Sequence, residues 1–453
     1  MTDRAKICLI VNSQPGELRA GLTRDGELVD VLIHRDSKEP GPGDIYQGRV
    51  RRVVKAMKAA FVDLGTGPDG FLPLKGGVTA TEGDYLLVQV RAPARDDKGP
   101  VLTARPNLAG PRLILTVGAS GLKPSKSLPK QARSQALAAL EGRETDEDGF
   151  ILRRSSLVTG EDDLRAEAVR LTEQWLRVQE EASGGKGSRR LLSSDPLADL
   201  ISAFLSQGGG ADGLIADDPV IASHLGALAG MAPKVSNPKA GLFEAHGLEE
   251  KLEAALSPVV PLPSGGSLVL EQTAAVLAVD VNSGGGLKTG TEVVRITNTE
   301  AMRALAAQIR LRGLSGHVVV DGLSLEKRPV GSPALQTFKA ALAREEVQAD
   351  IGGITSQGLM EFTLRRTRSS LGSLCGPGNA TARAFRLLRQ AQSLGIDHPA
   401  GGRICLRAPS ATVEDLRRGQ SAAFRAQIEE RLAITIALEE AEPVSTQEVR
   451  YER

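Results

Sequence analysis

Two aspartates, each at the end of an apolar run, are the residues best placed to do chemistry. Residues 273–281 are almost continuously apolar and carry Asp280, and a β-branched run after His317 leads into Asp321. Such runs are typical of buried parallel strands. The carboxyl ends of parallel strands meet along one edge of a sheet, so we expect both carboxylates to open onto that edge.

A divalent cation would neutralise the repulsion between two converging carboxylates. Mg²⁺ favours one or two carboxylates with several waters and phosphate oxygens, so the pair suits an ion shared with a phosphodiester. Asn282 and Ser283 follow the first run and could hold a water ligand. On spacing alone an alternative stays open, in which Asp280 begins an Asx-turn and Asp321 ends a strand before Gly322.

A helix is needed to connect the two strands if they are parallel. Residues 297–300 read Thr-Asn-Thr-Glu, which is helix-start chemistry. The apolar residues that follow fall on one helical face: Ala301, Met302, Leu305, Ala306 and Ile309. Residues 273–321 are therefore predicted to form a βαβ unit.

Composition places the chain among ordinary soluble globular proteins. Of its 453 residues, 41% are hydrophobic and 25% are charged. The length predicts roughly three to five structural units. The net charge of +1 does not by itself indicate a nucleic-acid binder. No apolar run approaches the ~20 residues of a membrane span, so a cytoplasmic protein is expected. Cys8, Cys375 and Cys405 are too few for a disulfide framework and are expected to stay reduced.

Five short strand-like runs within residues 41–108 predict an OB-type barrel, namely 45–54, 59–64, 70–74, 85–90 and 101–104. Phe61 and Phe71 lie in two of these runs and could stack nucleobases. The residues alone favour a core position for Phe61 and leave Phe71 undecided. A local basic surface is expected from Arg49, Arg51, Arg52, Lys55 and Lys58, with a merely solvated strand face as the alternative.

The segment that follows the barrel is expected to mix strands and helices. Strands are predicted around residues 113–117 and 149–153, and helices over 130–140 and 161–180. The glycine-rich residues 284–290 lack the order of a phosphate-binding loop, so a mobile loop is expected there, with Lys288 meeting phosphate.

Several motifs, in this order, resemble the ribonuclease E/G family of endoribonucleases. The catalytic half of the family is similar to residues 271–273, 279–284, 308–312 and 318–321, and the stretch after it to residues 358–361 and 365–371. Its S1-type domain is similar to Gly48 and to residues 59–65, 70–74 and 98–99. The resemblance covers most of the chain.

This resemblance implies a multidomain α/β fold in which an RNase H-like fold is interrupted by other domains. The implied order is the first segment of the RNase H-like fold (1–40), an S1-type OB barrel that binds RNA (41–108), a 5′-sensor-like segment (109–205), the second segment of the RNase H-like fold (206–268), a DNase I-like α/β catalytic domain (269–372), a degenerate zinc-link region (373–380) and a small α/β C-terminal domain (381–453).

The resemblance also implies a Mg²⁺-dependent endoribonuclease that hydrolyses single-stranded RNA to 5′-phosphate and 3′-hydroxyl ends in RNA processing, including that of rRNA, or decay. Asp280 and Asp321 match the family's metal ligands, and Asn282 matches the residue that assists them in catalysis. The family's RNA-contacting positions are matched by Phe61, Phe71 and Lys98. The alternative is a catalytically silent RNA-binding paralogue.

The chain departs from the family pattern at several positions. Cys375 is kept from the family's Cys-Pro-X-Cys, but Gly378 replaces the second thiol, so a zinc link is not expected and a homodimer through the small domain stays open. Arg153 and Arg154 stand where the family's 5′-phosphate site has Arg and Thr. Ser324 and Leu364 replace an acidic residue and an arginine. A degradosome scaffold region is not expected, because the family's long C-terminal arm has no counterpart.

Overall fold

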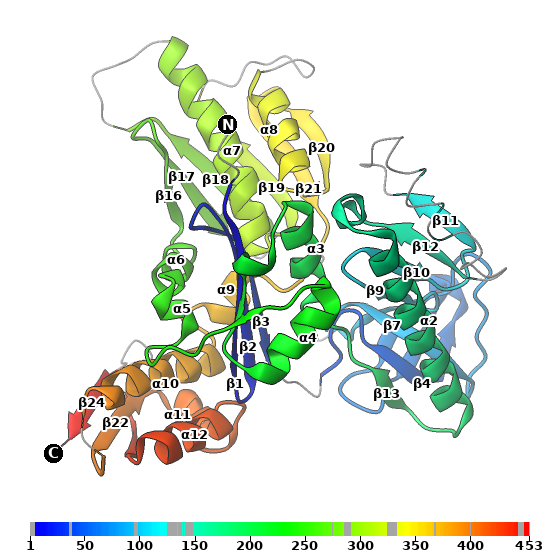
Figure 1. Ribbon diagram of the computed structural model, residues 1–453. Helices are drawn as coiled ribbons and strands as arrows, with labels where there is room; N and C mark the ends of the chain where they lie inside the picture. The colour runs from blue at the N-terminus through cyan, green and yellow to red at the C-terminus, as the bar shows by residue number, and fades with distance from the viewer. Residues whose placement is uncertain are drawn as a thin grey trace. The chain divides into compact units, whose positions relative to one another are not determined.

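The computed structural model describes residues 5–35, 39–94, 98–124, 134, 138, 140, 148–273, 275–284, 291–323, 333–366, 368–398, 400–442 and 448–452. The chain divides into two compact units (Figure 1). Unit 1 comprises Met1–Gly26 and Leu32–Leu242, and unit 2 comprises Glu27–Val31 and Phe243–Arg453. No described helix is both long enough and apolar enough to cross a membrane.

The first sheet of the chain has the strand order β15-β14-β1-β2-β3. Strands β1 and β2 form an antiparallel hairpin, while β1 runs parallel to β14 and β14 parallel to β15. The elements of this region are β1 (Ile7–Gln14), β2 (Glu17–Arg24), β3 (Glu27–Arg35), α3 (Ala198–Ser206), η3 (Ala211–Gly213), β14 (Leu214–Ala216), α4 (Pro219–Ala229) and β15 (Lys234–Val235).

The five strands predicted for a barrel all form, and they close on one another. They are β4 (Ile45–Val54), β5 (Ala59–Asp63), β6 (Gly70–Pro73), β7 (Tyr85–Ala92) and β8 (Val101–Thr103), with η1 (Lys55–Met57) between β4 and β5. The order β4-β5-β6-β8-β7 is closed by pairing of β7 with β4, and β13 (Arg189–Leu192) adds to β4 from outside. Ala60, Val62, Leu72 and Leu102 fill the interior. The predicted five-stranded barrel is therefore confirmed.

A second small sheet of unit 1 packs against a long helix. Its order is β11-β12-β10-β9, and Trp175 and Leu171 of the helix share a core with Leu113 and Phe150. The elements are β9 (Asn107–Ala109), β10 (Leu113–Thr116), β11 (Gly121–Pro124), β12 (Gly149–Leu152), η2 (Arg154–Val158) and α2 (Glu161–Ser183). The strands and helix predicted around residues 113–117, 149–153 and 161–180 are confirmed, whereas the helix predicted over 130–140 falls mostly outside the described residues.

Unit 2 is built on a six-stranded sheet of order β16-β17-β18-β19-β21-β20. Strands β18 and β19 are parallel, and the remaining neighbours are antiparallel. Helices α7 and α8 contribute Leu305 and Phe338 to the core that covers one face of the sheet. The elements are α5 (Leu242–Ala245), α6 (Leu248–Ala254), β16 (Val259–Pro261), β17 (Ser267–Gln272), β18 (Val276–Asn282), α7 (Thr291–Arg312), β19 (Gly316–Asp321), α8 (Pro333–Arg344), β20 (Ala349–Ile354) and β21 (Leu359–Leu364).

The predicted βαβ unit is present, but the prediction that its helix starts at residues 297–300 was wrong. Helix α7 already begins at Thr291, so these residues lie in its interior. Two of these polar side chains bond elsewhere instead of capping: Asn298 is buried and bonds to the backbone of Leu323, and Thr299 bonds back to the carbonyl of Arg295. Thr and Asn are common at helix starts, but here Asn298 has a tertiary partner and the Thr299 hydroxyl bonds within the helix.

The end of unit 2 is a small α/β segment. A three-stranded sheet of order β23-β22-β24 shares its core with three helices through Ile404, Leu406, Phe385 and Phe424. The elements are α9 (Leu371–Cys375), α10 (Ala380–Ile396), β22 (Arg403–Ala408), α11 (Ser410–Arg418), α12 (Ala422–Leu432), β23 (Thr435–Glu440) and β24 (Glu448–Glu452). All three cysteines of the chain are free thiols.

A buried ion pair ties helix α2 to its sheet and to the end of α4. Arg112 and Glu167 are each 4% exposed, and Arg112 Nη1 lies 3.1 Å from Glu167 Oε2. Glu167 Oε1 accepts the backbone N–H groups of Arg112 and Leu113, and the guanidinium donates to the carbonyls of Leu228 and Ala229. All charged atoms of the pair therefore have partners, which a buried pair requires to be tolerated.

We expect Glu167→Ala to destabilise this region of unit 1 by about 3 kcal/mol or more, because it leaves the Arg112 guanidinium buried without its counter-charge. Urea unfolding followed by fluorescence checks this, since the only tryptophan, Trp175, is buried in the same core. Glu173→Ala is the matched control, because Glu173 pairs with Arg177 on the exposed face of the same helix. Equal unfolding midpoints for the two variants would contradict the expectation.

Candidate active site

The two predicted aspartates face each other across neighbouring parallel strands. Asp280 of β18 is the register partner of Asp321 of β19. Both are exposed, whereas Val279, Val281 and Val320 point into the core on the opposite face of the sheet. Neighbouring strands lie about 4.8 Å apart, so the two carboxylates stand side by side. The predicted juxtaposition is therefore confirmed.

The hydrogen bonds of this pair among the described residues include no Asx-turn at Asp280. Asn282 Nδ2 donates to Asp280 Oδ2 over 2.8 Å from the same face of the strand. Within the described parts of the chain no backbone N–H group bonds to either carboxylate, as an Asx-turn would require, and no Lys or Arg lies within 4.0 Å of them. Two adjacent carboxylates that form no ion pair with the described residues fit a divalent cation, for which Asp280 and Asp321 would supply oxygen ligands.

Further carboxylates line the same open face of the sheet. Glu361 of β21 pairs with Val319, so it is the diagonal neighbour of Asp321, about 7–8 Å away between Cα atoms. Glu271 of β17 pairs with Ala278 on the other side. The sequence motif around Glu361 was part of the family resemblance, but no site role was assigned to it. The alternation of exposed and buried residues in β21 is the signal that could have placed it on this face.

The chain is held tightly where it leaves each of the two strands. After β18, Gly284 has φ +76°, and a Cβ atom there would lie 2.4 Å from the carbonyl oxygen of Gly265, so only glycine fits. After β19, the buried Asn298 side chain accepts from Leu323 N and donates to Leu323 O over 3.1 and 2.7 Å. The sequence pattern indicated a helix cap at Asn298. In the structure its side chain instead holds the backbone two residues after Asp321.

Three sequence-based expectations concern residues next to this edge or in the same sheet. Lys288 and Ser324 lie outside the described residues. Leu364, at the position where the family has arginine, is buried in the core of the sheet and pairs with Gly316.

A pocket of about 380 Å³ between α8 and β20 is lined by Lys339, Asp350 and Arg365 but by neither aspartate.

Phe61 and Phe71 form a pair on the outside of the barrel. They are register partners on β5 and β6, with ring centroids 6.0 Å apart at an angle of 70°. The Arg52 guanidinium lies 5.2 Å from the centre of the Phe61 ring. Both phenylalanines are half-buried, and the interior positions belong to Ala60 and Val62. The core position that the residues alone favoured for Phe61 was therefore wrong, because alternation in β5 places it outside.

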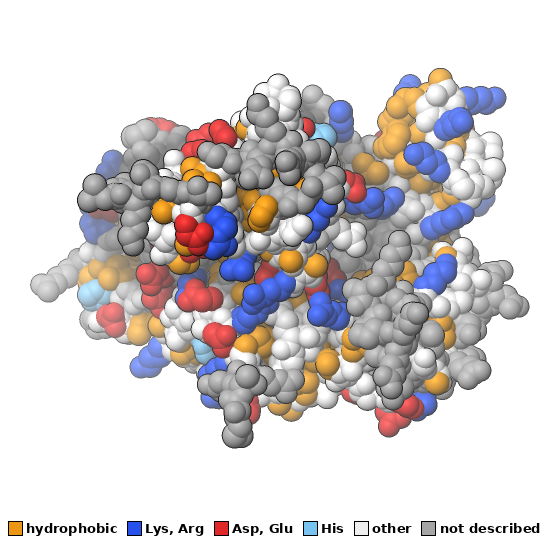
Figure 2. Space-filling view, turned by 90° about the horizontal axis from the view of Figure 1, so that it is seen from above, with side chains coloured by type: hydrophobic (Ala, Val, Ile, Leu, Met, Phe, Trp, Pro, Cys, Tyr) orange, Lys and Arg blue, Asp and Glu red, His pale blue; other side chains and the backbone are white. Residues whose placement is uncertain are grey.

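The predicted basic residues and Lys98 are all exposed on the barrel. The Phe71 N–H group donates to the carbonyl of Pro100, which places Lys98 two residues from the backbone partner of Phe71. Arg51 is partly neutralised by Asp63 and Asp69, at 3.0 and 3.5 Å. On the face of the molecule seen in Figure 2, Lys and Arg side chains and Asp and Glu side chains are both exposed. The basic surface is local rather than a field of one sign.

The two arginines proposed for 5′-phosphate binding differ in their surroundings. Arg153 Nη1 donates to Asp199 Oδ1 over 2.8 Å and to the Gly110 carbonyl over 3.1 Å, and its side chain is only 19% exposed. Arg154 begins η2 and is exposed. A phosphate at Arg153 would therefore have to compete with the exposed carboxylate of Asp199.

Comparison with known proteins agrees with the motifs. The sequence model described as "Ribonuclease E/G family" matches residues 107–367, more than half of the chain. Ribonuclease G of Escherichia coli (strain K12) is 28% identical over 394 residues, covering 80% of each chain. Ribonuclease G of Haemophilus influenzae is 29% identical over 401 residues, again covering 80% of each chain, and ribonuclease E of the same organism is 29% identical over 400 residues, covering 81% of this chain and 42% of that protein. The chain therefore belongs to the ribonuclease E/G family.

Proposed function

We propose that this protein is an endoribonuclease that hydrolyses single-stranded RNA with the help of Mg²⁺ held by Asp280 and Asp321. The observation that carries the proposal is the register pairing of these two exposed carboxylates at the end of parallel strands. The relatives named ribonuclease G and ribonuclease E support RNA as the substrate class. We propose that this reaction serves RNA processing or decay.

When bound, Mg²⁺ would polarise a phosphate oxygen and lower the pKa of an attacking water. Three side chains of the protein supply the geometry for binding the ion. Asp280 and Asp321 offer oxygens from one edge of the sheet, and Asn282 fixes the rotamer of Asp280 through its 2.8 Å hydrogen bond. Because Asn282 uses Asp280 Oδ2, the other oxygen of that carboxylate stays available for a cation or a water.

We propose water, rather than the 2′-hydroxyl of RNA, as the nucleophile, so that the products carry 5′-phosphate and 3′-hydroxyl ends. Attack by the 2′-hydroxyl is commonly assisted by a general base and a general acid, most often histidine. Of the described residues on this open sheet face, His317 is the one histidine, and it lies at the far end of β19 from Asp321, hydrogen-bonded to Thr363. Among the described residues, the proposed reaction edge carries the two carboxylates and Asn282.

The barrel would hold the single strand through its outer aromatic pair. Phe61 and Phe71 present ring surface on neighbouring strands, and Arg52 and Lys98 add positive charge beside them. Stacking on aromatic rings is tolerant of base identity, and basic side chains track the phosphate backbone. This combination suits a single-stranded substrate without strict sequence preference.

We expect Asp280→Asn and Asp321→Asn each to lower the rate of Mg²⁺-dependent RNA cleavage on the order of 10³-fold, because each removes a charged metal ligand. Single-turnover cleavage of an AU-rich, 5′-monophosphorylated oligoribonucleotide measures this. Asp350→Asn is the control, since Asp350 lies on β20 beside Thr363, away from the pair. RNA binding without cleavage by the unaltered protein would instead establish a silent RNA-binding paralogue.

Alanine at Phe61 or at Phe71 should weaken binding of single-stranded RNA by about 1–3 kcal/mol, because each ring can stack a base. Fluorescence anisotropy with a labelled oligoribonucleotide checks this, with D321N as the background so that the RNA stays intact. Met57→Ala is the control, because Met57 is an exposed apolar side chain of the same barrel. Unchanged affinity in both phenylalanine variants would show that the pair does not contact RNA.

Substitutions at Arg153 and at Asp199 should change the preference for a 5′-monophosphate in opposite directions. Arg153→Ala should abolish any preference for a 5′-monophosphate over a 5′-hydroxyl substrate, whereas Asp199→Asn should strengthen it by releasing the guanidinium from its 2.8 Å ion pair. The ratio of cleavage rates for the two substrates is the measurement. If that ratio is the same in both variants and in the unaltered protein, Arg153 is a structural residue.

A further inference from the structure

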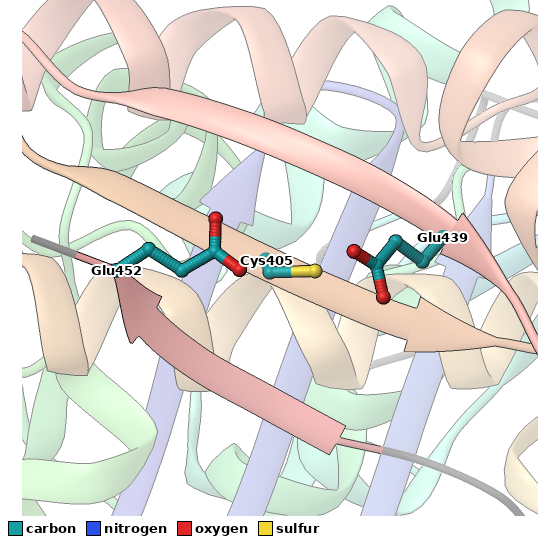
Figure 3. A group of neighbouring side chains, drawn as sticks. All are labelled: Cys405, Glu439 and Glu452. Atoms are coloured by element: carbon teal, nitrogen blue, oxygen red, sulfur yellow. The ribbon is translucent and has the colours of Figure 1, made fainter.

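Three side chains with metal-binding atoms converge in the small C-terminal sheet, within the same unit as the aspartate pair but on different strands. They are Cys405 of β22, Glu439 of β23 and Glu452 of β24. One ligand atom from each, the thiol sulfur and two carboxylate oxygens, lies within 4.8 Å of the other two. Figure 3 shows the sulfur between the two carboxylates.

The register of the sheet explains why these residues meet. Glu439 pairs with Arg407 on one side of the central strand, and Glu452 pairs with Arg403 on the other. Cys405 lies between these two arginines, so the period of two along each strand places all five side chains on the same face. The opposite face carries Ile404 and Leu406, which are in the hydrophobic core.

The thiol is an unusual group to bury between two acids. Cys405 is 2% exposed, and burial, followed by the hydrogen bond to Glu439 and the charges of Glu439 and Glu452, raises the pKa of its thiol. Glu452 is fixed by Arg403 at 3.1 Å and Arg450 at 2.9 Å, whereas no salt bridge of Glu439 occurs among the described residues. The Glu439 carboxylate therefore accepts the thiol hydrogen bond without an ion pair among the described residues.

We propose that Cys405, Glu439 and Glu452 bind a divalent transition-metal ion of the zinc class. Cys405 would supply sulfur and each glutamate one oxygen, which gives three protein ligands and leaves a fourth position for water. The thiol proton would be released to solvent on binding, because the thiolate is the ligand. A sulfur ligand favours Zn²⁺ over Mg²⁺ and Ca²⁺, which prefer oxygen ligands only.

This site is separate from the family zinc link that the sequence lacks. That link involves the position of Cys375, at the end of α9, whereas Cys405 is in the middle of β22. A metal at Cys405 would join all three strands of the small sheet, including the last strand of the chain. Zinc is therefore expected to stabilise this sheet within one chain rather than to link two chains.

Cobalt is the probe that distinguishes this site from the proposed Mg²⁺ site. The full chain, freed of metal with a chelator, is titrated with Co²⁺ under reducing conditions, and a thiolate-to-cobalt charge-transfer band in the near ultraviolet is expected to saturate at one equivalent. Cys405→Ser should lose the band, and Cys375→Ser is the matched control that should keep it. The double variant D280N/D321N should also keep it, so the outcome does not depend on nuclease activity.

Three further measurements complete the test. Glu439→Gln should weaken Co²⁺ binding by about tenfold or more, and Zn²⁺ but not excess Mg²⁺ should displace the cobalt. Circular dichroism of Cys405→Ser and Cys405→Ala checks that the sheet still forms. No charge-transfer band in the unaltered protein, a band that persists in Cys405→Ser, or a band lost in Cys375→Ser would overturn the proposal.

Discussion

The parallel pairing of β18 with β19 is the constraint on which the proposed chemistry of this protein depends. It sets Asp280 opposite Asp321, and a shift of one residue in either strand would turn one carboxylate into the core. Alternating residues of both strands, Leu277, Val279 and Val318 among them, are buried under α7 and α8, and this burial enforces the register. The hydrophobic core of unit 2 therefore determines the position of the two charges.

Placing like charges side by side has an electrostatic cost, and no described residue of the sheet forms an ion pair with either aspartate to lower it. Glu271 and Glu361 extend the acidic character of the open face, and exposure to water is what keeps this arrangement tolerable. Such a surface would repel RNA in the absence of a cation. The proposed Mg²⁺ thus has two roles, since it would neutralise the face and activate the reaction. Aromatic and basic residues of the barrel in unit 1 would bind the single-stranded RNA.

Much of this could be predicted from sequence because the relevant signals are local. Runs of alternating and continuous apolar residues located the five barrel strands and the two strands that carry Asp280 and Asp321. The errors came from residues whose partners are distant. Asn298 looked like a helix cap but bonds to Leu323, and Phe61 looked like core within an apolar run but lies on the outer side of its strand. The convergence of Cys405, Glu439 and Glu452 depends on the register of three strands, which spacing along the chain does not reveal.

The most direct test of the central claim is metal rescue of a modified RNA. A single phosphorothioate at the cleavage site replaces one non-bridging oxygen with sulfur, which binds Mg²⁺ poorly and Mn²⁺ better. If Asp280 and Asp321 hold an ion that contacts the scissile phosphate, cleavage of this RNA should be slow in Mg²⁺ and restored in Mn²⁺. Cleavage that is equally fast in both metals, or that proceeds without a divalent cation, would contradict the proposed role of the two aspartates.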